Sequence, residues 1–444
     1  MKSNGIKIAL ALNVLMMTGF VLSGGEKDID TSEKPTADSS ATKRMSNVII
    51  ILADDLGCGD ISLYDGWVQT PRIDQMAREG VTFSDFHSNA SLCSPTRAAL
   101  LTGRYQQRVG IIEVVKGYRD THGLEDTELT IPRLMKQNGY KTAIFGKWYL
   151  GWEPRYNPIH HGFDEFIGFL HGACSYLKHD DWRDGTEVKE QKGYSTHIIT
   201  DRSVDFIRRN KDNPFFLYVS HQAVHNYYQI PSDSLETKGR DIPLKGEVAR
   251  TRYEIIVQGL DKSVGKIMDT LRELNLEENT IVIFFSDNGD VRMGTNVRPY
   301  RGGKGTLYEG GHRIPAIVRW PGRIKAGWTS DELIVGMDIL PTVMDLVGVD
   351  ISKQRKFDGI SIKNHLLNQT DIPDRKVFFG HEPRFGTAMR DGHWKMLTKG
   401  DVIELYDLSK DIKETNNIAD KYPKRTKEMI AAIEKWKLEV KRAE

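Results

Sequence analysis

The chain has 444 residues, of which 39% are hydrophobic and 28% are charged. This length gives room for two or three domains, and this composition is typical of a soluble globular protein rather than a disordered or membrane-embedded one. Lys and Arg number 62 against 61 Asp and Glu, so the formal net charge is +1. That balance argues against a nucleic-acid-binding protein, because such proteins usually carry a basic excess or stripe.

The N-terminal segment has the layout of a secretory signal peptide. Lys2 and Lys7 precede an apolar run at positions 8–22, and small residues follow at 23–25. The run is short for a membrane span, so we expect no stable one; a buried core helix is the alternative. We expect residues 1–25 to be removed on export, to the periplasm or the medium. Residues 26–45 are polar and predict a flexible linker.

From residue 46 to residue 350, short apolar runs alternate with amphipathic stretches. The runs are β-branched or aromatic, as expected for parallel strands buried on both faces; they cover residues 47–53, 141–145, 214–219, 280–285 and 314–319. Helical patterns lie between them, at residues 70–79, 94–104, 129–138, 194–209 and 250–274. This alternation predicts a doubly wound α/β domain with a large, mostly parallel sheet between helices.

Beyond residue 350 the pattern changes. Strand-like pieces at 393–397 and 404–406 precede a final helix near 424–441. Apolar residues recur in that helix at helical spacing: Met429, Ile433, Trp436 and Val440. We therefore predict that residues 351–444 form a smaller C-terminal α+β domain with a short antiparallel sheet.

Polar side chains, most of them ionisable, follow four of the predicted strands. Ligands bind outside the carboxyl ends of the strands in open α/β sheets, so these side chains point to one shared crevice. The residues concerned are Asp54, Asp55, Lys147, His221, His225, Asp287 and Asn288.

Three of these residues are carboxylates, which repel one another unless a cation neutralises them. Asp54, Asp55 and Asp287, with the amide oxygen of Asn288, form an all-oxygen set that suits Ca²⁺ or Mg²⁺ rather than zinc. Taken singly, an Asp-Asp pair is more often a strand-end turn or helix cap, and Asp-Asn-Gly is more often a tight turn. Together they predict a metal site.

The segment 91–105 places Cys93 at the N-terminus of a predicted helix. Backbone N–H groups there favour anions, and Arg97 lies one turn further on the same face. A thiolate of the tyrosine-phosphatase kind needs Arg six positions after the Cys, where this chain has Ala99. A buried structural cysteine is the ordinary interpretation of a single Cys, but it leaves Pro95 and Arg97 unexplained.

The segment closely resembles the signature of the type I sulfatases, C-x-P-x-R followed by L-T-G-R, within the alkaline phosphatase superfamily. Further matching segments follow in order over most of the chain, at residues 54–57, 146–148, 162–164, 222–225, 286–289 and 303–311. In that family a maturation enzyme oxidises the Cys to formylglycine, an aldehyde that hydrates to a geminal diol.

The resemblance implies a metal-binding role for five matching residues. They would bind Ca²⁺ through side-chain oxygens, including a hydroxyl of the modified cysteine. These residues are Asp54, Asp55, Cys93, Asp287 and Asn288.

The resemblance also implies a catalytic set around that ion. Arg97 would orient the hydrated aldehyde, Lys147 and Lys304 would hold the sulfate oxygens, and His225 would protonate the departing alcohol. One diol hydroxyl would attack sulfur, and the aldehyde would re-form as sulfate leaves.

The chain departs from the family pattern at Tyr149, where the family usually has a His that takes a proton in the second half-reaction. A phenol with its usual pKa near 10 is a poor base at neutral pH. Either the metal and nearby lysines lower the pKa of Tyr149, or His171 or His221 substitutes; we expect all three near the substrate. Whether Cys58 pairs with Cys174 is open.

We therefore predict an exported sulfatase that acts on a sulfated polysaccharide or oligosaccharide and needs a formylglycine-generating maturation enzyme as a partner. A His- and Trp-containing stretch at 160–182 favours a glycan over a small aryl ester. Two alternatives stay open. One is a phosphate or phosphonate monoester hydrolase of the same superfamily, and the other is a catalytically silent glycan-binding homologue.

Overall fold

The computed structural model describes residues 45–291, 300–381 and 386–441. The predicted signal peptide and nearly all of the predicted linker lie outside the described residues. In the described part of the chain, every helix is too short or too polar to cross a membrane.

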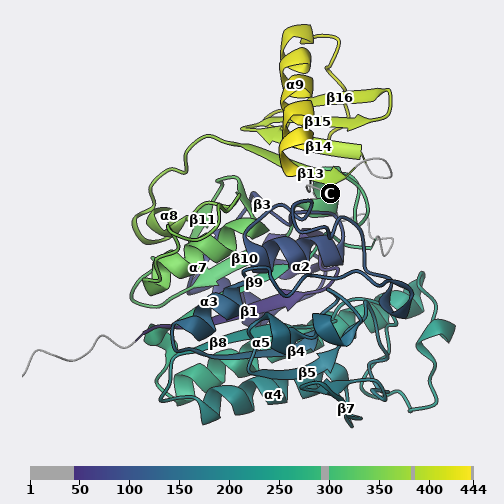
Figure 1. Ribbon diagram of the computed structural model, residues 1–444. Coiled ribbons are helices and arrows are strands. Elements are labelled where there is room, and N and C mark those ends of the chain that lie inside the picture. Colours follow the sequence, from purple (N-terminus) through teal and green to yellow (C-terminus); the bar gives the residue numbers. More distant parts are fainter. Residues whose placement is uncertain (1–44, 292–299, 382–385, 442–444) are drawn as a thin grey trace, which may run out of the picture. The chain divides into compact units, whose positions relative to one another are not determined.

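A ten-stranded sheet forms the centre of the α/β part, in the order β11-β2-β10-β9-β1-β8-β4-β5-β6-β7 (Figure 1). Five neighbouring strands, β9-β1-β8-β4-β5, run parallel. The strands are β1 (Asn47–Ala53), β2 (Val81–Phe83), β4 (Lys141–Lys147), β5 (Glu165–Phe169), β6 (Arg183–Asp184), β7 (Glu187–Val188), β8 (Phe215–Ser220), β9 (Thr280–Ser286), β10 (Ala316–Arg319) and β11 (Trp328–Ser330). A separate two-stranded sheet pairs β3 (Phe86–His87) with β12 (Ile334–Val335).

One predicted strand runs in the opposite direction to the one expected. Residues 314–319 were expected to form a parallel strand, but β10 pairs antiparallel with both β9 and β2. Ala316, the first residue of β10, lies opposite Phe285 near the end of β9, so β10 begins at the carboxyl edge of the sheet. A strand that begins at this edge runs antiparallel to β9, which ends there.

Alternate side chains of β1 enter two different hydrophobic cores. Ile49 and Ile51 pack with α1 (Pro71–Arg78), α4 (Ser195–Arg209) and α5 (Glu247–Glu273). Ile50 packs on the other face, with helices α2 (Cys93–Thr102), α3 (Ile131–Gln137), α7 (Ile339–Val347) and α8 (Lys363–Asn368). Burial on both faces explains why the strand is a continuous apolar run, and it confirms the predicted layered α/β fold.

The predicted C-terminal antiparallel sheet is confirmed. Its four strands lie in sequence order: β13 (Lys376–His381), β14 (Gly386–Asp391), β15 (Trp394–Lys399) and β16 (Val402–Asp407). Helix α9 (Pro423–Val440) buries its predicted apolar stripe, and the rings of Phe378 and Trp436 stack at 4.8 Å. Between residue 350 and β13, Ile362 and α8 still pack in the α/β core.

A buried cluster of charges joins this sheet to the short helix α6 (Glu309–His312). The Glu309 carboxylate lies 2.9 Å from Lys395, 3.0 Å from Arg313 and 3.2 Å from Arg390, and Lys395 lies 2.9 Å from Glu414. Burial alone would raise the pKa of Glu309, but the attraction of Lys395 and Arg390 outweighs it and lowers the pKa well below its usual range. The cluster fixes α6 to the C-terminal sheet.

Replacing Lys395 by methionine tests this cluster. The Lys395→Met variant leaves two fully buried carboxylates, Glu309 and Glu414, without their shared cation. We expect the free energy of unfolding, measured by urea denaturation, to fall by about 3 to 5 kcal/mol. Lys399→Met is the matched control, because Lys399 is exposed on the same strand and its loss should cost less than about 0.5 kcal/mol. Equal effects of the two substitutions would contradict the role of the cluster.

A candidate active site at the carboxyl edge of the sheet

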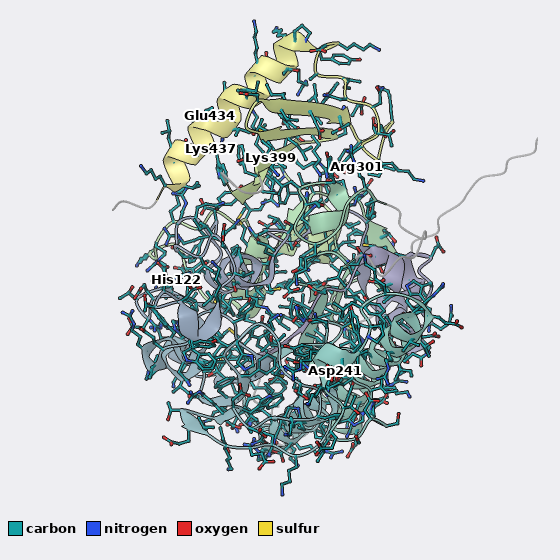
Figure 2. All side chains as sticks on the ribbon, turned by 90° about the vertical axis from the view of Figure 1, so that its right-hand side faces the viewer. His122, Asp241, Arg301, Lys399, Glu434 and Lys437 are labelled. Atoms are coloured by element: carbon teal, nitrogen blue, oxygen red, sulfur yellow. The ribbon has the colours of Figure 1, made fainter. Side chains whose placement is uncertain are left out.

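The predicted site residues come together where the parallel strands end. Asp54 and Asp55 follow β1, Lys147 ends β4, and Asp287 and Asn288 follow β9. In Figure 1, β1 runs toward the right, so Figure 2 looks onto the carboxyl ends of these strands. This is the edge at which open α/β sheets bind ligands.

The backbone at Asp55 directs two neighbouring carboxylates to one place. In an extended strand, the side chains of Asp54 and Asp55 would point to opposite faces. Asp55 instead adopts a left-handed conformation with φ 66°, which Asp tolerates better than most residues. One ligand atom from each of Asp54, Asp55, Cys93 and Asp287 then lies within 4.8 Å of the others.

Arg97 occupies the bottom of the site, and its side chain has no exposed surface. Its guanidinium donates two hydrogen bonds to the same carboxylate oxygen of Asp287, at 2.7 and 3.0 Å. It also donates to the Ser220 hydroxyl at 2.6 Å and to the backbone carbonyl of Lys147 at 3.3 Å. Three elements, α2, β4 and β8, therefore fix its position.

Two lysines contact the other carboxylates. Lys147 Nζ lies 2.5 Å from Asp54, and Lys304 Nζ lies 2.5 Å from Asp55 and 3.3 Å from the sulfur of Cys93. Burial opposes ionisation of Asp54, but the attraction of Lys147 and other nearby cations outweighs it, and the pKa of Asp54 falls below its usual range. With Arg97 included, three cations face three carboxylates.

Lys304 is placed by a tightly hydrogen-bonded loop. Gly305 N donates to the Ser91 carbonyl at 2.9 Å, and Gly310 N donates to the Arg301 carbonyl at 2.8 Å, which closes the loop. The Arg301 guanidinium donates to the Tyr406 hydroxyl at 3.2 Å, on β16. The loop thus connects the neighbourhood of Cys93 to the C-terminal sheet.

The thiol of Cys93 is a poor nucleophile in this setting. Burial, and then the nearby Asp287 carboxylate, raise its pKa to about 12. A thiolate is the reactive form of cysteine, and almost none is present at neutral pH when the pKa is this high. The geometry therefore disfavours direct thiolate chemistry at this position.

The donor set fits a hard divalent cation. Asp55 Oδ2 and Asn288 Oδ1 are buried, and neither has a hydrogen-bond partner among the described residues. The amide nitrogen of Asn288 donates to Asp55 Oδ1 at 2.7 Å and to the Gly289 carbonyl at 2.9 Å, so the amide oxygen is the atom left over. Buried oxygens without partners call for an explanation, and an oxygen-binding cation such as Ca²⁺ supplies one.

His225 lies at the mouth of the site. Its Nδ1 is 2.8 Å from the backbone carbonyl of Asn226, which can only accept, so Nδ1 carries a proton. Its Nε2 faces Asp55 Oδ2 at 3.6 Å. The side chains of His225 and Lys304 are 17% and 19% exposed, whereas those of Asp54, Arg97 and Lys147 are 0% exposed. A substrate therefore reaches the site beside His225 and Lys304.

The structure does not bring His221 to this site, although we expected it near the substrate. Its side chain is fully buried, and Nε2 lies 2.9 Å from the hydroxyl of Ser263 on α5. Burial lowers its pKa to about 3. Ser220 and His221 are neighbours at the end of β8, so their side chains point to opposite faces, and only Ser220 meets Arg97.

Tyr149 and His171 lie beside the site. Lys147 Nζ is 4.7 Å from the centroid of the Tyr149 ring. Burial nevertheless raises the pKa of Tyr149 to about 12, because it outweighs the attraction of Lys147 and Lys304. The expectation that nearby lysines lower the pKa of Tyr149 is therefore not met. His171 Nε2 lies 2.5 Å from Asp181, and its ring stacks on Trp152.

The three cysteines are all free. The Cys174 thiol contacts Gln222 Oε1 at 2.7 Å, whereas the Cys58 sulfur lies 4.0 Å from the Arg313 carbonyl. Cys58 and Cys174 therefore do not pair.

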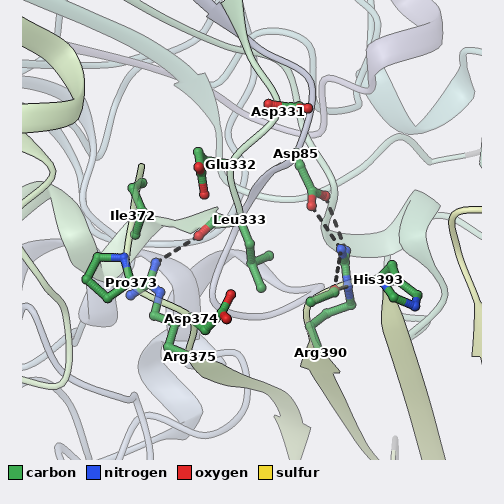
Figure 3. Close-up of a pocket in the computed structure, with 11 residues that line it drawn as sticks. Asp85, Asp331, Glu332, Leu333, Ile372, Pro373, Asp374, Arg375, Arg390 and His393 are labelled. Carbon is green, nitrogen blue, oxygen red and sulfur yellow. Dashed lines mark hydrogen bonds and ion pairs between the residues drawn. The ribbon is translucent and has the colours of Figure 1, made fainter. Parts of the chain in front are cut away.

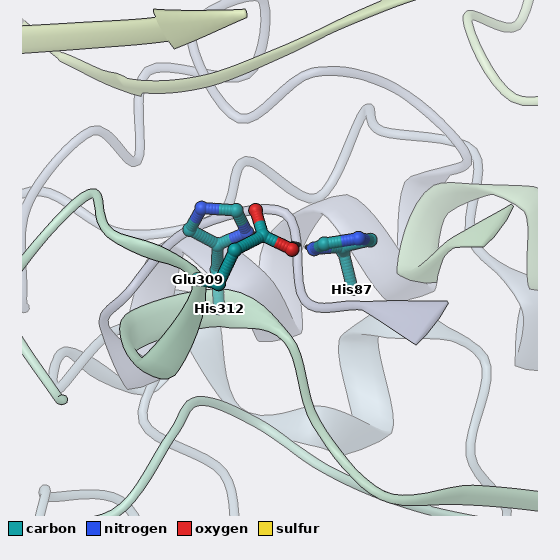
Figure 4. A group of neighbouring side chains, drawn as sticks. All are labelled: His87, Glu309 and His312. Atoms are coloured by element: carbon teal, nitrogen blue, oxygen red, sulfur yellow. Dashed lines mark hydrogen bonds between the residues drawn. The ribbon is translucent and has the colours of Figure 1, made fainter. Parts of the chain in front are cut away.

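A second group of possible metal ligands is His87, Glu309 and His312 (Figure 4). The two rings face each other with their Nδ1 atoms 2.8 Å apart, so one hydrogen bond occupies both atoms. Arg390 and Lys395 lie 3.3 and 3.2 Å from the other ring nitrogens. All four ring nitrogens therefore already have partners within the protein, and the group belongs to the buried charge cluster.

A pocket of about 230 Å³ lies between the C-terminal sheet and the segment before β12 (Figure 3). Ion pairing of Arg390 with Asp85 and a hydrogen bond from Arg375 to the Leu333 carbonyl hold its walls. None of the residues that line it is a predicted site residue.

Comparisons with known proteins find similar sequences and structures. The family model described as Sulfatase matches residues 46–349, and that described as N-sulphoglucosamine sulphohydrolase, C-terminal, matches residues 303–443. N-acetylgalactosamine-6-sulfatase of Canis lupus familiaris is 35% identical over 367 residues, 75% of this chain and 68% of that protein. The same enzyme of Homo sapiens is 34% identical over 374 residues, 77% of this chain and 69% of that protein. Among solved structures, Ps i-CgsB in complex with k-i-k-neocarrahexaose gives a TM-score of 0.81 at 28% identity, covering 88% of this chain and 93% of that chain.

Proposed function

The chain belongs to the sulfatase family and is a sulfuric ester hydrolase, and from this premise we propose that it removes sulfate from a sulfated carbohydrate with the help of formylglycine at position 93 and Ca²⁺. The observation that carries the proposal is the clustering of Cys93 with three carboxylates and three cations. The carbohydrate substrate is supported by the names of similar proteins, one an N-acetylgalactosamine-6-sulfatase and another crystallised with neocarrahexaose. The signal-peptide layout of residues 1–25 supports action outside the cytoplasm.

Asp54, Asp55, Asp287 and Asn288 would hold the ion together with the group at position 93. When bound there, Ca²⁺ would supply positive charge that acidifies a hydroxyl, and formylglycine would supply that hydroxyl as the nucleophile toward sulfur. A formylglycine-generating maturation enzyme is the partner that this requires.

The fixed side chains stabilise negative charge on the sulfate. A sulfate ester is an anion, and Arg97, Lys147 and Lys304 place three cations around the position of Cys93. Preorganised cations in a water-poor site stabilise charge that builds up on oxygen in the transition state. Arg97 is held by Asp287 and Ser220, so it needs no reorganisation during the reaction.

His225 is placed to give a proton to the leaving alcohol. Its Nδ1 is held by the Asn226 carbonyl, so Nε2 is the atom that faces the site. The form that donates is therefore the imidazolium, which carries protons on both ring nitrogens. Its Nε2 proton lies beside Asp55 at the exposed end of the site, where the alcohol part of the ester must leave.

The proposal is tested on protein co-expressed with a formylglycine-generating enzyme. Mass spectrometry of the tryptic peptide 79–97 should show formylglycine in place of Cys93. The same protein should release sulfate from sulfated oligosaccharides and prefer 4-nitrophenyl sulfate to 4-nitrophenyl phosphate. An unmodified thiol, or a preference for the phosphate ester, would overturn the proposal.

Tyr149→His is expected to raise kcat by about tenfold to a hundredfold. Tyr149 is protonated at neutral pH because burial raises its pKa to about 12, so it cannot accept a proton in the second half of the reaction. A histidine titrates near pH 6.5, and it is among the residues that tolerate the left-handed φ of 58° at this position. The variant's pH profile should gain a limb that rises through pH 6 to 7, as the imidazole loses its proton. An unchanged kcat and profile would show that Tyr149 does not limit turnover.

A further inference from the structure

An aromatic surface begins beside the catalytic lysine and leads away from it. The ring of Tyr149 lies under Lys147 Nζ. A side chain at Gly172 would overlap the Tyr149 phenol, so the backbone at Gly172 packs directly on that ring. His171 precedes Gly172 in the chain, and its ring stacks on Trp152 with a centroid separation of 5.7 Å.

The surface continues to an exposed tyrosine. The ring of Tyr118 lies 6.5 Å from that of Trp152, nearly perpendicular to it. Tyr118 is 72% exposed, and Trp152 and His171 are partly exposed. We call Tyr118, Trp152 and His171 the aromatic platform. Adjacent exposed aromatic rings are uncommon on a protein surface that binds nothing.

The aromatic platform is held in place from two sides. Asp181 fixes the His171 ring through a 2.5 Å contact with Nε2. Gly117, with φ 64°, brings the Tyr118 loop against both other members, since a Cβ at Gly117 would lie 3.9 Å from His171 and from Trp152. A surface that is already ordered binds a ligand with a smaller entropic cost.

We propose that the aromatic platform binds the sugar ring next to the one that carries the scissile sulfate, in an anionic oligosaccharide; this rests on the proposed function. Flat C–H faces of pyranose rings stack on the faces of Tyr and Trp rings. The same loop exposes Lys116, which favours a sulfate or carboxylate on that neighbouring ring, and His122, which lies 4.0 Å from Asp120. Figure 2 shows His122 at the rim of the face onto which the strands' carboxyl ends open.

Packing alone gives Tyr118 little reason to be aromatic, because most of its surface is exposed. Its removal should therefore leave the fold intact, which makes it the cleanest member of the platform to test. Tyr118→Phe keeps the ring, and Tyr422→Ala removes a partly exposed tyrosine at the start of α9 as the matched control.

The experiment measures binding by titration calorimetry on a Cys93→Ala background, in which no turnover occurs. The probes are N-acetylgalactosamine 6-sulfate, a chondroitin 6-sulfate tetrasaccharide and neocarrahexaose. We expect at least one oligosaccharide to bind at least about tenfold more tightly than the monosaccharide, and Tyr118→Ala to remove about five- to tenfold of that preference. Tyr118→Phe and Tyr422→Ala should keep it.

The outcomes separate the two proposals. If the probes bind but the preference is the same in Tyr118→Ala as in Tyr422→Ala, the aromatic platform is not a subsite and the proposed function stands. If no probe binds and the unmutated protein releases sulfate from none of them, the proposed function fails and the subsite fails with it.

Discussion

Replacing Cys93 by alanine is expected to lower kcat by roughly 10⁴-fold or more, without loss of the fold. The side chain at position 93 lies within reach of Asp54 and Lys304, in contact with the groups that would activate and orient a nucleophile. Alanine offers no group that can be converted to an aldehyde, so no neighbouring residue can restore the chemistry. Sulfate release under saturating substrate measures the effect.

The matched control is Cys58→Ala. Cys58 is also buried, but its sulfur lies 4.0 Å from the backbone carbonyl of Arg313 and contacts none of the predicted site residues among the described hydrogen bonds. We expect turnover within about threefold of the parent protein, because the substitution removes a small packing group away from the carboxylates. Comparable losses in the two variants would mean that cysteine removal damages the fold and that Cys93 has no special role.

Asp287→Asn is expected to cost roughly 10³-fold or more in kcat and to abolish stabilisation by calcium. Asp287 accepts two hydrogen bonds from Arg97 and one from the backbone N–H of Asp55. One carboxylate therefore positions both the Arg97 guanidinium and the backbone turn at Asp55. The amide has a similar shape but lacks the charge that Ca²⁺ and Arg97 both need.

Thermal denaturation with and without Ca²⁺, after dialysis against a chelator, measures the second effect. For a chain of this size, calcium at about 100 to 1,000 times its Kd should raise the Tm of the parent protein by about 3 to 5 °C. Asp287→Asn should show a shift below about 1 °C. Asp261→Asn is the control, because Asp261 is a buried carboxylate that accepts from backbone N–H groups at the start of α1, outside the site. A calcium shift that persists in Asp287→Asn would remove this residue from the ion site.

The long central elements were predictable from sequence because their patterns are strong. β1 is a run of seven buried residues, and α5 repeats apolar residues over 27 positions. The direction of β10 was not predictable, because a strand buried on both faces has the same pattern whichever way it runs. The sequence did not predict β2, which has three residues, or the paired strands β13 and β14. Their hydrophobic patterns are too short to be distinguished from those of loops.

The residues of the candidate site were predicted together because each follows a strand that ends at the same edge. The same reasoning wrongly included His221, and the missing step was the alternation of side chains along a strand. Ser220 faces Arg97, so the next residue must face α5. The pair His87 and His312 was not found, because its members come from distant segments and share no motif.

The cluster of Glu309, Lys395 and Glu414 has a consequence for exchanging parts between relatives. The loop of Lys304 ends at Glu309, and that residue is held by two side chains from the far end of the chain. A chimera that takes about its last hundred residues from another family member must supply residues at positions 395 and 414 that pair with Glu309. Otherwise the loop that positions Lys304 loses its contact with the C-terminal sheet. Hybrids that take Glu309, Lys395 and Glu414 from the same parent should be active far more often than hybrids that take them from different parents.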